Sequence, residues 1–540
     1  LALAGCDALK PDVIWKDLRL DPLRDSNLIE ADFFQLVLNR NAGSQTILDK
    51  GFDVVLGNPP FESKLTEPGR RVDRHAKKAH SQRGKLPDNQ AAYLFLEQAL
   101  ETLRPDGSAC LIQPFGLLYN RKAQPFGAYL WNRCRVDSIL DFISIRNLYS
   151  KDTKTVAVCA SVASPGEDHA IRHWTFRRTF SVHQRICFEL DHYDHHRVLQ
   201  RTAVSDPFVW RTNLLGGGRL LGISQRIRSM SSLAEYVAEQ GWDYGEGFIV
   251  GNRKKESPFL TGSRFLPSTA LTGQGIDETK IGVVEETRFE APRREELYTP
   301  PIVLIRENQS LPIAFWDKGF LAYRDKIVGI SAPRSSLAAL RQFYETLEHR
   351  RETYRFCCTL NGSQLLVGKS TAILKQDIDA LPYPKAPNAL GLSFWEEVLQ
   401  DDVLRYMAEY VRLGQNSALL KKAAQLEDLQ TYAGLFCRML GSVYDNLCAG
   451  EAVFLDGLIC QPFYFGKRPK SAWLTENSRE TLHDLIYHQH YESLRTVRVL
   501  RFYSENVLLI VKPDRLRYWI RSTAIRDADE TLVDLREQGY

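Results

Sequence analysis

Short apolar runs that end at turn residues organise the first part of the chain. The run Phe52-Asp53-Val54-Val55-Leu56 is rich in β-branched and aromatic residues and is short enough for a buried strand. It stops at Gly57-Asn58-Pro59-Pro60, a sequence that can continue neither a strand nor a helix. The pattern therefore predicts a strand that delivers Asn58 to a rigid turn.

The alternation of strands and helices continues to about residue 165. Apolar side chains at helical spacing predict a helix over residues 89–103, which the turn at Pro105-Asp106-Gly107 ends. A loop is predicted over residues 145–153, and strands are predicted over residues 108–114, 139–142 and 155–160. This β-α-β order is typical of α/β proteins and favours a parallel arrangement of strands.

The pattern changes after Pro165, where the regular alternation stops. Short strands separated by turn residues are predicted over residues 302–305, 313–316 and 327–330, followed by a helix over 343–356. Long helical patterns then fill residues 393–447, and residues 496–512 alternate like a β-hairpin with its turn at 504–506. These patterns predict a mixed α/β middle region and an α-rich C-terminal module.

Two polar stretches bear on possible ligands. Residues 62–88 are rich in Lys and Arg and poor in large apolar side chains, which predicts a solvated, mobile loop that could close over a DNA backbone. Residues 183–197 contain His183, His192, His195 and His196. Because this cluster lacks a second, distant pair of ligands, the sequence favours a solvated linker over a metal site, and no metal is expected.

The composition is that of an ordinary globular protein. The 540 residues are 44% hydrophobic and 25% charged, and the length predicts about three domains. The net charge of +4 is only mildly basic, so a DNA-binding face has to come from local clustering of charge. No apolar stretch approaches the length of a membrane span. The ten scattered cysteines indicate free thiols in a reducing compartment, and we expect a cytoplasmic protein.

The turn at Asn58 suits one chemistry. The exocyclic amine of adenine is a poor nucleophile, because its lone pair is delocalised into the ring. The amide oxygen of Asn58 and the backbone carbonyl of Pro59 lie side by side, so each could accept a hydrogen bond from one N–H group of the amine. The fixed proline φ holds the second acceptor still. Phe61 would offer an aromatic face to a base swung out of its stack. A stiff turn without a catalytic role is the alternative interpretation.

The motif Asn58-Pro59-Pro60-Phe61 resembles the Asn-Pro-Pro-Tyr/Phe catalytic motif of the gamma-class N6-adenine DNA methyltransferases, as in fused type II restriction-modification proteins of the Eco57I-like methylase family. These enzymes use S-adenosylmethionine. The segment from Leu28 to Phe34 is similar to the family's strand and acidic turn, whose Asp receives the adenine amine of the cofactor and whose next aromatic residue lies against that ring. The resemblance implies that Asp32 and Phe33 bind the cofactor.

The resemblance also implies roles for later segments. In the family, an aromatic residue in the loop before a late strand stacks on the flipped adenine, and Tyr149 stands at the matching place. An ordinary loop tyrosine is the alternative. The glycine-rich stretch from Trp242 to Arg253 resembles the opening of the target-recognition region in fused enzymes, and Lys375 to Pro384 resembles its end.

The expected fold is α/β: the C-terminal part of a Rossmann-like methyltransferase sheet, a mixed α/β target-recognition domain, and an α-rich module with a terminal β-hairpin. We expect a catalytic domain over residues 1–165, a DNA target-recognition domain over 166–390, and a DNA- or partner-binding module over 391–540. The chain opens at Leu1 and no Gly-rich cofactor loop precedes Asp32, so we expect an N-terminal truncation that removes the first strands of the sheet.

The resemblance implies a site-specific enzyme that transfers a methyl group from S-adenosylmethionine to adenine N6 in double-stranded DNA, by direct displacement, within a restriction-modification or phage-defence system. Its catalytic residues would be Asn58, Pro59, Pro60, Phe61 and Tyr149. A restriction or defence-system subunit is a further candidate partner. Two alternatives stay open: an enzyme that methylates RNA or a protein glutamine, and a non-catalytic DNA- or partner-binding fragment.

Overall fold

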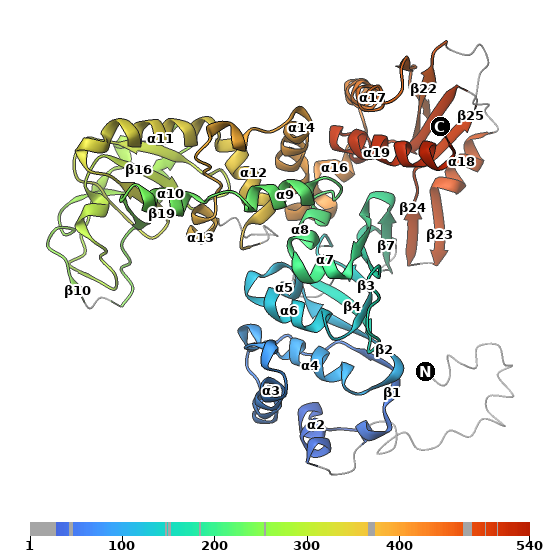
Figure 1. The fold of residues 1–540 in the computed structure, drawn as a ribbon, viewed down its shortest axis with the longest axis horizontal. Coiled ribbons are helices and arrows are strands. Elements are labelled where there is room, and N and C mark those ends of the chain that lie inside the picture. Colours follow the sequence, from blue (N-terminus) through green and yellow to red (C-terminus); the bar gives the residue numbers. More distant parts are fainter. Residues whose placement is uncertain are drawn as a thin grey trace.

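A six-stranded sheet with the order β1-β2-β4-β3-β5-β8 forms the first part of the molecule (Figure 1). The computed structural model describes residues 29–42, 47–145, 148, 153–182, 185–252, 255–364, 373–467, 478–491, 493–504 and 506–539. The strands are β1 (Phe52–Gly57), β2 (Leu103–Pro114), β3 (Arg135–Asp141), β4 (Thr155–Ser161), β5 (Ala170–Thr175) and β8 (His195–Leu199). The predicted strands before residue 165 are therefore confirmed, and the sheet continues past the expected domain boundary through β5 and β8.

The strand directions are mixed. β1 and β2 are parallel, and the chain between them forms α3 (Glu67–Ala79) and α4 (Ala91–Leu100), so the predicted helix and the β-α-β unit are confirmed. β3 and β5 are also parallel, whereas β4 runs antiparallel to both of its neighbours and β8 runs antiparallel to β5. The parallel arrangement expected from the alternation thus holds for only part of the sheet.

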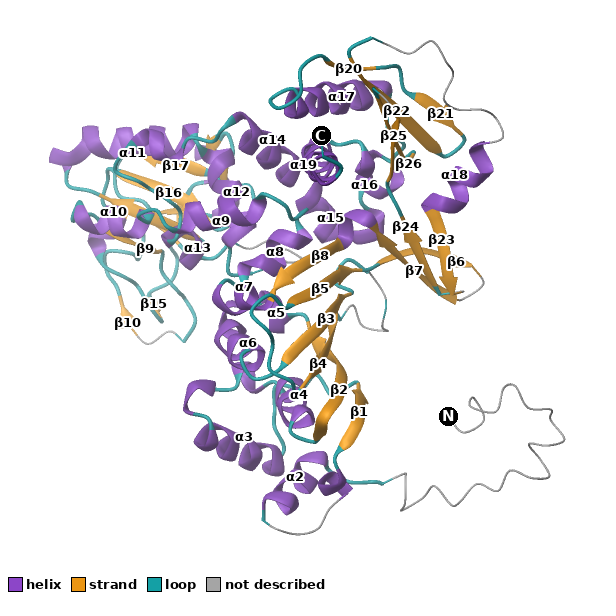
Figure 2. Ribbon diagram, turned by 45° about the vertical axis from the view of Figure 1, so that its right-hand side comes forward, coloured by secondary structure: helices purple, strands orange, loops and turns teal. Residues whose placement is uncertain are grey.

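Helices lie on one side of this sheet. Figure 2 shows α4, α5 (Gly116–Tyr119) and α6 (Gln124–Trp131) on the same side, while the opposite side of β1 and β2 carries no helix among the described residues. The side chains of Val54 and Leu56 are accordingly 61% and 74% exposed. The expectation that β1 is a buried strand is therefore wrong for this face.

The stretch over residues 62–88 is ordered, and the expectation of a mobile loop is wrong. Thr66 caps α3 by accepting a hydrogen bond from the Gly69 amide, and Val72 and Ala76, four residues apart, are buried. After the helix, the Arg83 guanidinium is buried between Asp73 and Glu97, at 2.7 Å from a carboxylate oxygen of each. The sequence pattern missed this helix because only two of its side chains and one buried charge attach it to the core.

The middle region packs helices beside a four-stranded antiparallel sheet with the order β17-β16-β19-β9. The predicted strands are confirmed as β16 (Ile302–Arg306), β17 (Ile313–Trp316) and β19 (Ile327–Ser331), and β9 is Asp243–Glu246. The predicted helix over 343–356 is two helices, α11 (Leu337–His349) and α12 (Arg351–Asn361), which meet at Arg350. The other helices are α7 (Gln200–Ser205), α8 (Phe208–Leu214), α9 (Leu220–Arg228), α10 (Leu233–Glu239) and α13 (Lys375–Asp379).

A second, smaller core belongs to the outer part of this region, which lies at the left of Figure 1 around the label β10. Its short strands are β10 (Lys255–Glu256), β11 (Arg264–Leu266), β12 (Leu271–Thr272), β13 (Gly275–Ile276), β14 (Gly282–Val283), β15 (Arg288–Phe289) and β18 (Ala322–Tyr323). The bridge between Ser232 and Pro382 brings the segment after α13 back to the start of α10.

The C-terminal part contains more β-structure than expected. Its sheet has the order β20-β22-β26-β25, with β21 also paired to β22. The strands are β20 (Leu447–Ala449), β21 (Val453–Leu455), β22 (Leu458–Phe465), β25 (Leu500–Ser504) and β26 (Val507–Pro513), and the pairing of β25 with β26 confirms the hairpin. The helices are α14 (Phe394–Asp402), a π-helical turn (Val403–Met407), α15 (Ala408–Leu413), α16 (Ala418–Lys421), α17 (Leu426–Leu440), α18 (Ser478–Ile486) and α19 (Arg521–Glu537).

A further sheet joins the C-terminal part to the end of the first sheet. Its order is β23-β24-β7-β6, and β24 (Leu494–Val497) lies parallel to β7 (Arg185–Asp191). β6 is Arg177–Val182 and β23 is Tyr487–Tyr491. The expectation of a solvated linker around the histidine cluster is therefore wrong, since the described residues there form strands. Within the described residues, no group of three or more His, Cys, Asp or Glu side chains could hold a metal ion.

Candidate active site

The Asn-Pro-Pro-Phe turn follows directly on the carboxyl end of β1. Asn58 is exposed, Pro59 is buried and Phe61 is half-buried. The described residues offer the Asn58 side chain no hydrogen-bond partner, so its amide is available to a ligand. Because Pro59 is packed and its φ is fixed by the ring, its carbonyl has little freedom. The two acceptors that the sequence predicted are thus adjacent, one at the surface and one on a rigid support.

The chain after the turn is fixed to the rest of the catalytic region. The Glu62 carbonyl accepts a hydrogen bond of 2.9 Å from the Ala91 amide, at the start of α4. Leu65 is buried, and α3 begins directly afterwards. A strand therefore holds the motif from one side and two helices hold it from the other, which limits the motion of Phe61.

The loop that contains Tyr149 leaves the sheet at the same edge as Asn58. In the register of the sheet, Gly57 of β1 pairs with Leu111 of β2, Leu111 with Val158 of β4, and Val158 with Ile139 of β3. β3 therefore ends, and β4 begins, just beyond the level of Gly57, at the end of the sheet where β1 also ends. At about 4.8 Å per strand, β1 and β4 lie roughly 10 Å apart across β2. Tyr149 itself lies outside the described residues. The shared edge is what the structure establishes, and the stacking role of Tyr149 stays a prediction.

Asp32 caps a helix instead of ending a strand. α2 (Phe33–Asn41) begins after it, and Asp32 Oδ1 accepts hydrogen bonds of 2.8 Å from the Phe34 amide and 3.3 Å from the Gln35 amide. Residues 29–32 are not in a strand, so that part of the expected strand and acidic turn is wrong; Leu28 lies outside the described residues. The side chain of Asp32 remains exposed, which leaves acceptor capacity on the carboxylate.

Phe33 packs on the catalytic region from α2. Its ring stacks on Phe95 of α4 at a centroid distance of 4.9 Å and an interplanar angle of 15°, and the side chain is half-buried. Its neighbour Phe34 is buried against the same Phe95 ring at 4.6 Å. The Phe33 ring is thus held by packing but keeps part of its surface exposed, and the exposed Asp32 carboxylate precedes it in the chain. Asp32 and Phe33 are therefore compatible with the adenine end of S-adenosylmethionine.

A buried polar network at the end of β3 escaped the sequence analysis. Asp141 is fully buried and accepts hydrogen bonds from the Tyr119 hydroxyl and, at 2.8 Å, from the Ile143 amide. His173 Nε2 lies 3.4 Å from Asp141 Oδ2, the oxygen that also accepts from Tyr119. Burial and the adjacent carboxylate raise the pKa of Tyr119 far above its ordinary value, so the hydroxyl stays protonated and donates a hydrogen bond to Asp141. The network fixes the first residues of the loop that continues to Tyr149.

α3 gives the site a positively charged side. Arg71, Arg74, Lys77 and Lys78 are exposed along this helix, and the carboxylate of Glu67 offsets part of their charge. Hydrogen bonding to Arg70 lowers the pKa of Glu67, which therefore stays ionised. The helix begins at Glu67, six residues after Phe61, so its first turn lies nearest the candidate catalytic residues, whereas Lys78 near its far end lines a hollow with Arg40, Glu101 and Arg133.

Comparison with known proteins finds one matching family model. Residues 5–148 match the model of the Eco57I restriction-modification methylase family. The matched segment contains Asp32, Phe33 and the Asn58 turn, and Tyr149 lies just beyond it. A search of curated proteins finds no match. No described helix has the length and apolar character that crossing a membrane requires.

Solved structures of restriction-modification enzymes also resemble the chain. The type IIG restriction endonuclease BpuSI is 13% identical, with a TM-score of 0.29 over 70% of this chain and 51% of that one. The type IIL enzyme MmeI, solved in complex with DNA, is 12% identical, with a TM-score of 0.38 over 74% of this chain and 57% of that one. The M protein of the type I enzyme EcoKI is 20% identical, with a TM-score of 0.17 over 23% and 25% of the two chains. The chain thus spans about half the length of BpuSI and MmeI.

Proposed function

We propose that the protein is a site-specific DNA methyltransferase that methylates adenine N6 within a restriction-modification or phage-defence system. The observation that carries the proposal is the Asn58 turn at the carboxyl end of β1: an exposed amide without a partner in the described residues, next to a buried proline. The match of residues 5–148 to a restriction-modification methylase family supports it. The six-stranded sheet would be the C-terminal part of a Rossmann-like methyltransferase sheet.

The chain's own residues would prepare the adenine amine for attack. The Asn58 amide oxygen and the Pro59 carbonyl would each accept one N–H hydrogen bond, which makes the nitrogen more pyramidal and takes its lone pair out of conjugation with the ring. Phe61 and Tyr149 would hold the flipped base between two aromatic faces. Asp32 and Phe33 would hold the adenine of S-adenosylmethionine, which supplies the methyl group when bound. The amine proton leaves to solvent after transfer.

The remaining parts would position the DNA. The exposed cations of α3 would bind phosphates along the DNA backbone. We assign the target-recognition role to the middle region, residues 166–390 less the strands that complete the first sheet, and a DNA- or partner-binding role to residues 391–540. The double-stranded DNA would thus contact at least two parts of the chain.

The test is transfer of labelled methyl from S-adenosylmethionine to duplex DNA, with the modified nucleoside identified after digestion. The 540-residue chain is assayed beside a version extended upstream, because the chain spans about half the length of the enzymes it resembles. Label in N6-methyladenine supports the proposal. Label only in RNA or protein glutamine overturns the DNA substrate, and DNA binding without transfer by either version favours the non-catalytic alternative.

A further inference from the structure

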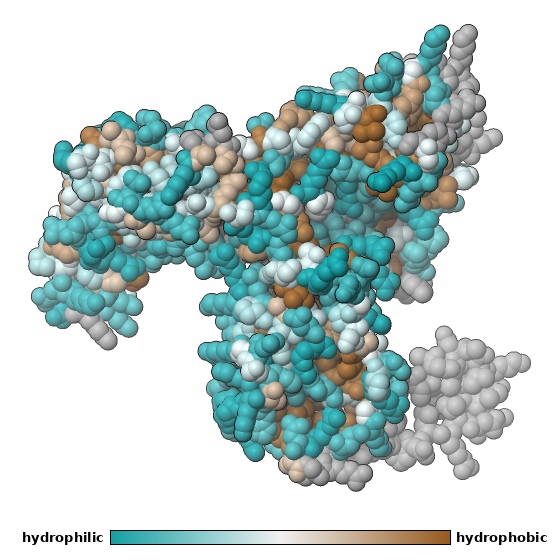
Figure 3. All heavy atoms as spheres, viewed as in Figure 1, coloured by the Kyte–Doolittle hydropathy of each residue, from teal (hydrophilic) through white to brown (hydrophobic). Residues whose placement is uncertain are grey.

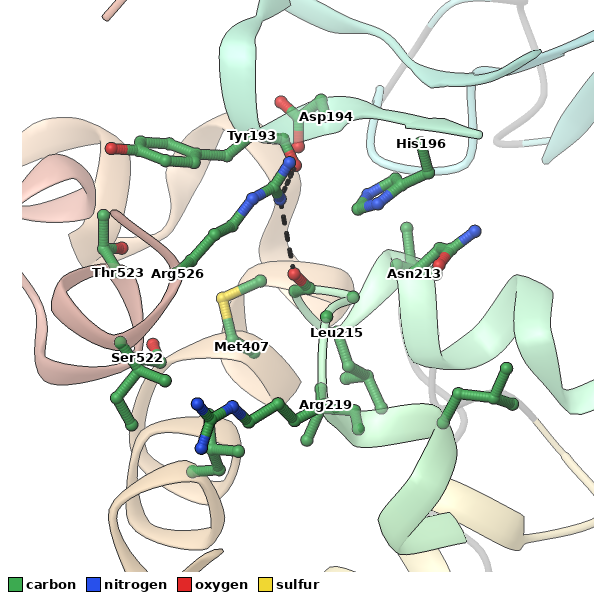
Figure 4. Close-up of a pocket in the computed structure, with 18 of the residues that line it drawn as sticks. Tyr193, Asp194, His196, Asn213, Leu215, Arg219, Met407, Ser522, Thr523 and Arg526 are labelled. Carbon is green, nitrogen blue, oxygen red and sulfur yellow. Dashed lines mark hydrogen bonds between the residues drawn. The ribbon is translucent and has the colours of Figure 1, made fainter. Parts of the chain in front are cut away.

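A cavity of about 460 Å³ lies beside β8 (Figure 4). β8 and β1 are the two outermost strands of the first sheet, so the cavity and the Asn58 turn lie at opposite edges of it. Its walls come from β8, from the turn between α8 and α9, from the π-helical turn after α14, and from α19. The volume falls within the roughly 300–1,000 Å³ typical of small-molecule sites. None of the residues assigned to methyl transfer lines it, so the cavity requires a separate explanation.

One side of the cavity is built for an anion. The turn Gly216-Gly217-Gly218 has φ values of 125°, 69° and 57°, a conformation that favours glycine at every position. Within the described residues, the Gly218 and Arg219 amides donate to no backbone carbonyl, and α9 begins directly after them. Amides at a helix start attract negative charge. A helix start alone defines no site, but here further groups converge on it.

His196 supplies the independent observation. It is 9% exposed, and its Nε2 has no hydrogen-bond partner in the described part of the chain. In Figure 4 its ring points from β8 toward the space between Arg526 and the turn that carries Leu215. A Cβ on Gly217 would come within 2.6 Å of this ring, so the glycine is also needed to admit it. Burial and nearby arginines lower the pKa of His196, which leaves a neutral imidazole with unused hydrogen-bonding capacity.

Two arginines face the same space, and each is held by a carboxylate. Arg219 donates two hydrogen bonds to Asp529, at 3.0 and 2.6 Å. Arg526 donates to Glu530 at 3.0 Å and to the Tyr193 carbonyl at 2.9 Å. Both guanidinium groups are thereby oriented before any ligand arrives. The cavity lining contains four arginines and three carboxylates, so positive charge prevails.

The other side of the cavity is apolar. Leu399, Val403 and Met407 from the π-helical turn and its preceding helix face Leu215 and Leu220 across it. A flexible thioether beside branched side chains suits a flat ring. The two sides together match a ligand with an aromatic or heterocyclic ring at one end and a compact anion at the other.

We propose that this cavity binds a nucleoside monophosphate, with the phosphate on the Gly216–Gly218 turn between Arg219 and Arg526 and the base against Met407. His196 would bond the ligand at the junction of the two halves. Because β8, α9 and α19 all contribute to the cavity, the ligand would stabilise the contact between the sheet of the first 200 residues and the C-terminal helix. The site is distinct from methyl transfer and does not depend on the function proposed above.

The test is isothermal titration calorimetry on the full 540-residue chain with AMP, CMP, adenosine and inorganic phosphate. At least one nucleotide should bind ten times more tightly than adenosine and than phosphate, because only the nucleotide fills both sides. Equal affinity for phosphate alone would reduce the site to an anion site and overturn the nucleotide. Absence of binding by both nucleotides would overturn the proposal as a whole.

Variants locate the binding. Arg219→Gln should weaken nucleotide binding about ten-fold, as expected for one charge-assisted hydrogen bond. Asp529→Asn should strengthen it, since it removes a negative charge that competes for Arg219; a purely structural ion pair would give no such gain. Arg201→Gln is the matched control, because Arg201 is exposed, lies outside the cavity and, among the described residues, pairs only with Asp168, at 3.9 Å. Phe33→Ala should leave the affinity unchanged, whereas a loss would place the nucleotide at the candidate cofactor site and overturn the assignment.

Discussion

Lys512 and Asp527 form an ion pair that is closed to solvent, with Lys512 Nζ 2.7 Å from Asp527 Oδ2 and neither side chain exposed. Lys512 lies in β26 and Asp527 in α19, so the pair attaches the last helix to the C-terminal sheet. Asp527 also accepts hydrogen bonds from Tyr193, Tyr432 and Arg501. One carboxylate therefore joins the end of the first sheet to three elements of the C-terminal part.

Removing this carboxylate should destabilise the protein strongly. We expect Asp527→Ala to lower the free energy of unfolding by about 3–5 kcal/mol, because Lys512 and Arg501 would be left buried beside each other. Urea unfolding followed by tryptophan fluorescence measures the change. Glu537→Ala, at an exposed position of the same helix, is the control and should cost little. A similar small loss for both variants would show that the buried pair contributes nothing.

The amide of Asn58 is the next target. Asn58→Ala should lower methyl transfer by at least about 100-fold, as removal of a preorganised hydrogen-bonding group does, while DNA affinity stays the same. Labelled-methyl transfer and a DNA mobility shift measure the two quantities. Because Asn58 is exposed, the variant should melt at the same temperature as the parent. If transfer and DNA binding fell together, the turn would be structural and not catalytic.

The exposed cations of α3 should act on DNA affinity and not on chemistry. Lys77→Gln combined with Lys78→Gln should weaken DNA binding and lower the slope of log affinity against log salt by about 2, since two phosphate contacts are lost. Fluorescence anisotropy across a salt series measures both. An unchanged slope for the α3 variant would remove this helix from the interface.

Glu307 should make stability depend on pH. It is 8% exposed, and burial, together with Glu246 nearby, raises its pKa to about 7. Between its ordinary value near 4.5 and 7, the folded state holds a proton that the unfolded state has released, so stability falls as pH rises through this window. Glu307→Gln should flatten the dependence of stability on pH between pH 5 and pH 8, because the variant lacks the one proton linked to folding. Calorimetric melting across this pH range measures the change. Exposed Glu296→Gln should retain the parent's slope.

Gly247 admits a close approach of two backbones. A Cβ at this position would lie 2.0 Å from the Tyr323 carbonyl oxygen, and the adjacent Phe248 amide donates to that oxygen at 3.0 Å. Gly247→Ala should therefore separate the segments around residues 247 and 323 and destabilise the middle region by about 3 kcal/mol. Gly222→Ala, inside α9 with open space around it, should instead be neutral or stabilise by about 0.5–1 kcal/mol. Hydrogen exchange of the two regions separates these outcomes.

Local patterns in the sequence located several of the strands. The strand before Asn58, the three predicted strands β16, β17 and β19 and the hairpin over 500–513 all form where apolar, β-branched runs end at turn residues. Each of these signals lies within about ten residues of chain, which is the distance over which propensity and turn chemistry act. The helix over residues 67–79 was missed for the converse reason, since its burial depends on distant partners such as Phe34, which lies against Gly69.

The sequence by itself determined the candidate chemistry, because the proline φ angles and the side chains of Asn58 and Phe61 are local properties. Only the tertiary structure decided that Asp32 caps a helix, that residues 494–497 pair with 188–191, and that Lys512 and Asp527 are buried together. The physical reason is that the burial of a charge or the pairing of an edge strand depends on groups outside the local segment: residues 494–497 pair with a strand about 300 residues earlier, and Asp527 accepts a hydrogen bond from Tyr193, 334 residues away. No periodicity along the chain records those partners, and the folded contacts alone supply them.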